Sequence, residues 1–231
     1  MPQEIRLHGK TMGTQYHINI PLIANHHFDQ KKLKHDIDRR LQAINQEMST
    51  YIPDSTISQF NQSHTTDWFP VSDAFLKLIT TAQTISKKSR GAFDITVMPL
   101  VNLWGFGTTK KHPFPTQAII NAQRKKVGYQ HLHLQAQPPA IRKDNPDVMI
   151  DLSAIAKGYA VDELAKLLQQ QGLQHFLVEI GGEIRVQGTN KHQKPWKIAI
   201  EKPNALARKV QQGLKLDDIA VATSGDYRNY Y

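Results

Sequence analysis

The N-terminal part of the chain changes from an alternating pattern of apolar residues to a helical one. Residues 5–20 predict two strands around a Met12-Gly13-Thr14 turn, and in the second strand apolar Tyr16, Ile18 and Ile20 alternate with polar residues. From Asp29 onward, apolar residues recur every three or four positions, as on one face of a helix. They are Leu33, Ile37, Leu41, Ile44 and Met48. Asp29 is suited to cap this helix, and Ser49-Thr50 to end it.

The same helical spacing predicts two more helices. One begins after Ser72, a candidate N-cap, and the other covers residues 154–171 and ends before Gly172. Their apolar faces contain Phe75, Leu78, Ile79, Ala82 and Ile85 in the first and Ala160, Leu164, Leu167 and Leu168 in the second. Strand-like runs follow at residues 176–180, 183–187, 196–200 and 219–223, with Gly181-Gly182 as a hairpin turn between the first two. Helices mostly precede strands without regular alternation, so we predict an α+β fold.

Composition places the chain among globular proteins and removes several kinds of site. Of its 231 residues, 39% are hydrophobic and none is cysteine, which excludes disulfides, thiolate metal ligands and a cysteine nucleophile. No apolar run reaches the roughly 18 residues of a membrane span, and residues 1–10 lack the apolar core of a signal peptide. The net charge of +9, from 29 basic and 20 acidic residues, is spread in short clusters. We therefore expect solvated surface lysines and no nucleic-acid partner.

The sequence contains none of the common nucleotide-binding or hydrolase motifs, so candidate chemistry must lie in segments that combine small residues, a carboxylate and an aromatic ring. One such segment, residues 91–94, follows the second predicted helix. Gly91 is consistent with a simple helix C-cap. Gly91 and Ala92 would equally let a flat ligand approach the backbone, while Asp94 accepts hydrogen bonds from N–H groups. The residues alone leave both interpretations open.

Residues 151–158 form a second candidate segment, at the start of the third predicted helix. Asp151 and Ser153 are suited to cap this helix, and its free backbone N–H groups favour an anion. Capping does not explain Lys157-Gly158, since a glycine within a helix costs about 1 kcal/mol relative to alanine. A ligand phosphate close to the backbone would explain the glycine at 158, and Lys157 would neutralise the charge of that phosphate. We expect this segment and residues 91–94 to face each other across a slot for a dinucleotide.

Taken in order, these segments resemble the ApbE family of FAD:protein FMN transferases. The matching stretches are residues 11–14, 48–61, 91–107, 151–162, 177–183 and 222–230. They span nearly the whole chain, and the stretches at 91–107 and 151–162 are long enough to be specific.

The resemblance implies a two-lobed α+β fold, with mixed or antiparallel sheets flanked by helices and a cleft for a flavin nucleotide between the lobes. It also implies a transferase that uses FAD and Mg²⁺ for protein flavinylation, in which FMN is attached through a phosphoester bond to a threonine of an exported flavoprotein and AMP is released. The implied acceptor is a respiratory subunit similar to NqrB, NqrC or RnfG. The implied location is the periplasmic side of the inner membrane, reached as a membrane lipoprotein through an anchor that this chain does not contain.

The resemblance assigns flavin contacts to seven residues and a metal contact to one. The expected FAD contacts are Met12, Tyr51, Ala92, Phe93, Asp94, Asp151 and Lys157, and the backbone carbonyl of Ala154 takes the position of a metal ligand. In the family, the other metal ligands and the catalytic base lie in a segment that would follow Tyr231. We therefore interpret residues 1–231 as one ApbE-like FAD-binding and FMN transferase domain without that segment, and expect weak or absent activity from these residues alone.

Two alternatives use the same flavin site. One is a module that binds FAD or FMN without chemistry, and the other is a Mg²⁺-dependent pyrophosphatase that hydrolyses FAD to FMN and AMP. Flavin that is retained with no release of AMP would favour the module. A basic nucleic-acid-binding protein is a third interpretation, which requires binding that weakens steeply with salt.

Overall fold

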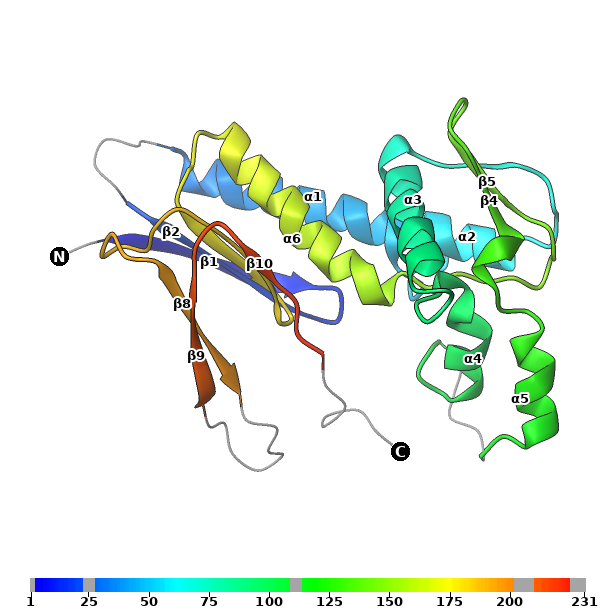
Figure 1. The fold of residues 1–231 in the computed structure, drawn as a ribbon. Coiled ribbons are helices and arrows are strands. Elements are labelled where there is room, and N and C mark those ends of the chain that lie inside the picture. Colours follow the sequence, from blue (N-terminus) through cyan, green and yellow to red (C-terminus); the bar gives the residue numbers. More distant parts are fainter. Residues whose placement is uncertain (1–2, 23–27, 109–113, 202–209, 225–231) are drawn as a thin grey trace. The chain divides into compact units, whose positions relative to one another are not determined.

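The chain folds into two compact units, which a computed structural model describes over residues 3–22, 28–108, 114–201 and 210–224 (Figure 1). The first unit combines residues up to Gln42 with those from Lys157 onward, and the second unit contains residues 43–156. The boundaries fall within two long helices, α1 (Gln30–Met48) and α6 (Ser153–Gln170). Helices and antiparallel strands occur in both units, which confirms the predicted α+β class.

The first unit is built on a five-stranded antiparallel sheet with the strand order β1-β2-β6-β7-β10. The strands are β1 (Glu4–Thr11), β2 (Thr14–Pro21), β6 (Phe176–Ile180), β7 (Glu183–Gln187) and β10 (Ala220–Val221). Both predicted hairpins are confirmed, whereas the strand predicted at 219–223 is reduced to the two residues of β10. A separate hairpin joins β8 (Trp196–Glu201) to β9 (Val210–Leu216).

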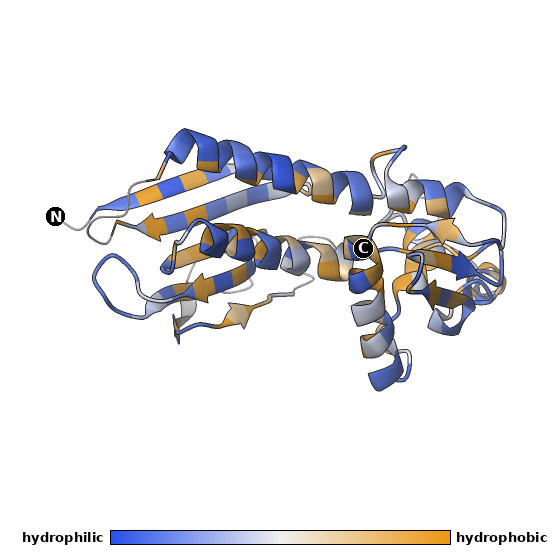
Figure 2. Cartoon of the chain, turned by 90° about the horizontal axis from the view of Figure 1, so that it is seen from above, coloured by the Kyte–Doolittle hydropathy of each residue, from blue (hydrophilic) through white to orange (hydrophobic). Residues whose placement is uncertain are grey.

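The parts of α1 and α6 that belong to the first unit cross one face of this sheet (Figure 1). Alternation explains the packing, because Tyr16, Ile18 and Ile20 of β2 are all buried, and Figure 2 shows hydrophobic and polar residues alternating along the strands. The Tyr16 hydroxyl donates to Asp38 of α1 over 2.7 Å, which ties helix to sheet. Burial of this hydroxyl raises the pKa of Tyr16 to about 12. Asp29 caps α1, as predicted, by accepting from the backbone N–H of Lys31 and Lys32.

The second unit contains the shorter elements of the chain. Its helices are α2 (Thr56–Gln62), α3 (Asp73–Lys88), α4 (Met98–Leu103) and α5 (Gln117–Arg124), with the 3₁₀ turns η1 (Ile95–Val97) and η2 (Tyr129–His131). A three-stranded sheet has the order β3 (Phe69–Pro70), β5 (Ala140–Lys143) and β4 (Leu132–Gln135). Ser72 caps α3 as predicted, but Ile85 is 38% exposed and does not belong to the buried face where the sequence placed it.

No helix among the described residues is both long enough and apolar enough to cross a bilayer. Of the stretch at 222–230 that resembles the ApbE family, residues 225–230 lie outside the described part of the chain.

Candidate functional site

Two hairpin turns lie side by side in the first unit. The β1–β2 turn holds Met12, with φ of 49°, and the β6–β7 turn holds Gly181, with φ of 56°. Pairing of β2 with β6 brings the turns together, and the Gly181 N–H donates to the Gln15 carbonyl over 3.3 Å. A Cβ at Gly181 would lie 2.8 Å from Thr14 Cγ2, so only glycine fits this approach without a shift. The structure thus brings together residues 11–14 and 177–183, two stretches singled out by sequence.

Lys157 of α6 lies at the β6–β7 turn. Its Nζ is 2.9 Å from Glu183 Oε2 and 3.4 Å from the Gly181 carbonyl oxygen. The Lys157 side chain keeps 31% exposure, so a ligand can approach the ammonium. A phosphate would share this ammonium with Glu183, and the glycine backbone would allow close approach. We refer to Lys157 and the two turns together as the turn site.

A hollow of about 800 Å³ lies beside the β1–β2 turn. It is lined by Lys10, Thr11, Met12, Gly13, Thr14, Gln15, His17 and Glu179. Glu179 also accepts from the Gly182 N–H over 2.7 Å, so the hollow and the β6–β7 turn share this carboxylate. Met12 is half-buried at the edge of this hollow, where a flavin nucleotide could contact it.

In the second unit, the Asp94 carboxylate ties two turns of the backbone together. Its Oδ1 accepts from the N–H and the hydroxyl of Thr96, over 2.8 and 2.7 Å, and its Oδ2 accepts from the Tyr129 N–H over 2.7 Å. The Thr96 hydroxyl in turn accepts from the Gly128 N–H over 2.7 Å. Both carboxylate oxygens are therefore already used for structure. The neighbouring Ala92 is exposed and Phe93 is half-buried, so the segment 91–94 has an accessible side.

Asp151 lies next to this segment. Its N–H donates to the Ile95 carbonyl over 2.7 Å, and its Oδ1 accepts from the N–H and the hydroxyl of Ser153. The hydrogen bond to the Ile95 carbonyl brings Asp151 next to the residue that directly follows the segment 91–94. The slot between this segment and the start of α6 stays a prediction, because neither hollow described here is lined by Asp94 or Asp151.

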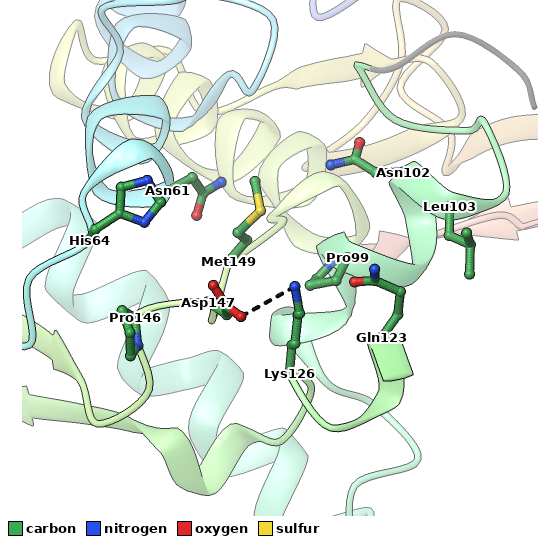
Figure 3. Close-up of a pocket in the computed structure, with 10 residues that line it drawn as sticks. All are labelled: Asn61, His64, Pro99, Asn102, Leu103, Gln123, Lys126, Pro146, Asp147 and Met149. Carbon is green, nitrogen blue, oxygen red and sulfur yellow. Dashed lines mark ion pairs between the residues drawn. The ribbon is translucent and has the colours of Figure 1, made fainter. Parts of the chain in front are cut away.

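A second hollow, of about 310 Å³, lies wholly within the second unit (Figure 3). We call it the loop pocket; its lining residues are Asn61, His64, Pro99, Asn102, Leu103, Gln123, Lys126, Pro146, Asp147 and Met149. Lys126 Nζ and Asp147 Oδ2 form an ion pair of 3.2 Å, drawn as a dashed line in Figure 3. The sequence did not predict that residues 123–126 and 146–149 contribute to a pocket. Both segments lie outside every stretch that carries the family resemblance.

Of the predicted site residues, only Met12 lines one of these two hollows, and Tyr51 and Ala154 are exposed away from both. Tyr51 follows α1, with 69% of its surface exposed, and its ring is free to stack on a ligand. Ala154 is exposed in the first turn of α6. No group of three or more His, Asp or Glu side chains in the described part of the chain is arranged to hold a metal ion. Since Mg²⁺ requires about six oxygen ligands, the described residues do not by themselves form a magnesium site around the Ala154 carbonyl.

Known proteins resemble this chain in sequence over most of its length. A family profile described as "ApbE family" matches residues 12–231. An FAD:protein FMN transferase from Vibrio cholerae is 45% identical over 233 residues, covering 99% of this chain and 68% of the relative, and the one from Escherichia coli K12 is 42% identical over 231 residues, covering 97% and 64%. The chain thus spans about two thirds of the length of these curated relatives.

Solved structures give the same result. The flavin transferase ApbE from Vibrio cholerae superposes with a TM-score of 0.90 at 43% identity, over 100% of this chain and 74% of that one. The apo flavinyl transferase ApbE from Pseudomonas stutzeri has a TM-score of 0.87 at 34% identity, over 100% and 72%. Profile, sequence and fold agree over nearly every residue, and this chain therefore belongs to the ApbE family.

Proposed function

We propose that this chain binds FAD and takes part in transferring FMN from it to a hydroxyl group of an acceptor protein. The observation that carries the proposal is the 42–45% identity, over nearly the whole chain, to proteins named FAD:protein FMN transferase. The turn site supports it, because Lys157 presents an ammonium beside a backbone turn made of two glycines. This is the chemistry that a pyrophosphate requires.

The proposed reaction exchanges one phosphorus–oxygen bond for another. The oxygen of an acceptor threonine attacks the FMN phosphorus, the phosphoanhydride bond breaks, and AMP leaves with the bonding electron pair on its phosphate oxygen. The threonine proton passes to a base. In this scheme the Lys157 ammonium neutralises charge on the pyrophosphate, and Glu183 holds that ammonium at the turn. The family resemblance assigns further FAD contacts to Tyr51 and to residues 92–94, and the exposed Tyr51 ring is suited to stack on an aromatic ring of the nucleotide.

Magnesium belongs to the proposal as the cation that lowers the negative charge of the pyrophosphate. The Ala154 carbonyl is the one contact that the family resemblance assigns to it. Because the described residues do not complete a metal site, no step above passes through the metal.

The acceptor and the location extend the proposal further. We expect a threonine of a respiratory flavoprotein subunit of the NqrB, NqrC or RnfG type, flavinylated on the periplasmic side of the inner membrane. Both expectations rest on the family resemblance.

The proposal is tested by incubating the full-length protein with FAD, MgCl₂ and an acceptor domain, then measuring covalent flavin fluorescence on a denaturing gel and AMP by chromatography. We expect both signals, and expect an acceptor with threonine replaced by alanine to abolish the covalent flavin. AMP and free FMN without covalent flavin would identify the pyrophosphatase, and bound FAD without AMP would identify the binding module. A protein that does not bind FAD would refute all three.

A further inference from the structure

Lys143, the last residue of β5, is a buried lysine that forms no salt bridge with the described carboxylates, although the Asp147 charge acts on it at longer range. Its side chain is 1% exposed. Its Nζ donates to the Phe60 carbonyl over 3.2 Å and to the Val148 carbonyl over 3.0 Å, and lies 5.0 Å from the centre of the Phe60 ring. Burial lowers the pKa of Lys143. A charge buried without a salt bridge is costly, and here the two carbonyl acceptors offset part of that cost.

The ammonium holds Val148 in a loop, residues 144–150, that runs from β5 to Asp151. Asn61 holds the same half of the loop at Ile150, because its side-chain oxygen accepts from the Ile150 N–H over 2.7 Å and its amide donates to the Ile150 carbonyl over 2.8 Å. Asn61 directly follows Phe60, whose carbonyl accepts from Lys143, so both anchors tie the loop to neighbouring residues of α2. A further hydrogen bond, from the Asp151 N–H to the Ile95 carbonyl, holds the residue that follows the loop.

The anchored loop has two sides. Val148 and Ile150 are fully buried, whereas Asp147 is exposed and Met149 is half-buried. Asp147 and Met149 line the loop pocket, and Figure 3 shows them on the same side of it as Asn61. Val148 therefore lies between two residues that line the pocket, and three residues before Asp151.

We propose that Lys143 is a positioning residue for flavin-nucleotide binding: it fixes loop 144–150 so that Met149 lines the loop pocket and Asp151 is held at the start of α6. This inference rests on the proposed function, since it assumes that FAD binds next to Asp151. Lys143 itself is buried and does not touch the substrate. Without its ammonium, the Phe60 and Val148 carbonyls lose their donor, and the loop samples other positions that FAD must first reorder.

The experiment compares Lys143→Met with a matched core variant, Ile79→Ala of α3, in the full-length protein. Ile79 is fully buried in the same unit. We expect both variants to lower the Tm, but only Lys143→Met to raise the Kd for FAD tenfold or more, measured by flavin fluorescence. At saturating FAD its kcat stays within threefold of the wild type, because the bound nucleotide restores the loop. An unchanged Kd, or an equal rise in Ile79→Ala, overturns the inference.

A second measurement needs no variant and stays decisive if Lys143→Met does not fold. Binding and loop order are coupled in both directions, so saturating FAD must slow amide hydrogen exchange of residues 144–151 in the wild type. We expect at least tenfold slower exchange there, with no change in α3. Bound FAD with unchanged exchange in the loop refutes the role of Lys143 while leaving the proposed function intact. A wild-type protein that binds no FAD refutes the proposed function itself.

Discussion

Replacing Asp94 by asparagine removes a charged acceptor at the junction of η1 and η2. The carboxylate accepts three hydrogen bonds, two from Thr96 and one from the Tyr129 N–H. An asparagine oxygen can keep the Thr96 bonds, but its NH₂ group then faces the Tyr129 N–H, donor against donor. A hydrogen bond to a charged group contributes about 1.5–3 kcal/mol. We therefore expect Asp94→Asn to lower the free energy of unfolding by about 2 kcal/mol.

The assay is thermal unfolding without flavin, followed by circular dichroism. A loss of about 2 kcal/mol corresponds to a Tm lower by roughly 4–8 °C for a chain of this size. Asp73→Asn is the matched control, because Asp73 is an exposed acid in the first turn of α3, where a charge contributes only about 0.3–1 kcal/mol. A Tm for Asp94→Asn no lower than that of the control would show that the carboxylate does not hold the two turns together.

Three further outcomes follow from the first unit. Burial raises the pKa of Tyr16 to about 12, while the unfolded side chain ionises near 10, so the free energy of unfolding should fall between pH 10 and 12. Tyr16→Phe should make this fall shallower, as measured by urea titrations at several pH values. Gly181→Ala should lower the Tm by several degrees, because its φ is positive and its Cβ would collide with Thr14, whereas Gly213→Ala, which meets nothing within 4 Å, should change it little. Lys157→Met should raise the Kd for FAD about tenfold by fluorescence titration, since charge-assisted contacts are worth about 1.5–3 kcal/mol; an unchanged Kd would remove Lys157 from the proposed site.

The elements that the sequence predicted well are those with enough residues to repeat a pattern. Helix α1 has nineteen residues and α3 has sixteen, so the apolar face recurs over several turns, and the caps at Asp29 and Ser72 add a local signal. Helix α2 has seven residues and β3 has two, too few for a period to show. The Ser55 cap of α2, which accepts from the Ser58 N–H over 3.2 Å, was therefore not predicted either.

The site was harder to predict because its contacts join residues far apart in the chain. Residue types and the family resemblance indicated Lys157, but the pairing with Glu183 depends on how the β6–β7 hairpin returns to α6. Nothing in the sequence indicated that Lys143 is buried, since a lysine at the end of a short strand is normally solvated. Only the packing of α2 against the following loop shows that its ammonium is enclosed.

Asp94 and Asp151 were given the same role from sequence, and their hydrogen bonds now separate them. Asp94 uses Oδ1 for Thr96, two residues along, and Oδ2 for the backbone of Tyr129, 35 residues away. Asp151 uses one oxygen, Oδ1, for the first turn of its own helix, and no described residue donates to Oδ2. Each carboxylate oxygen can accept more than one hydrogen bond, but an oxygen with no donor in the fold is the one most open to a nucleotide. We therefore expect Asp151 to contact FAD directly, and Asp94 to act mainly by holding the backbone of residues 91–94.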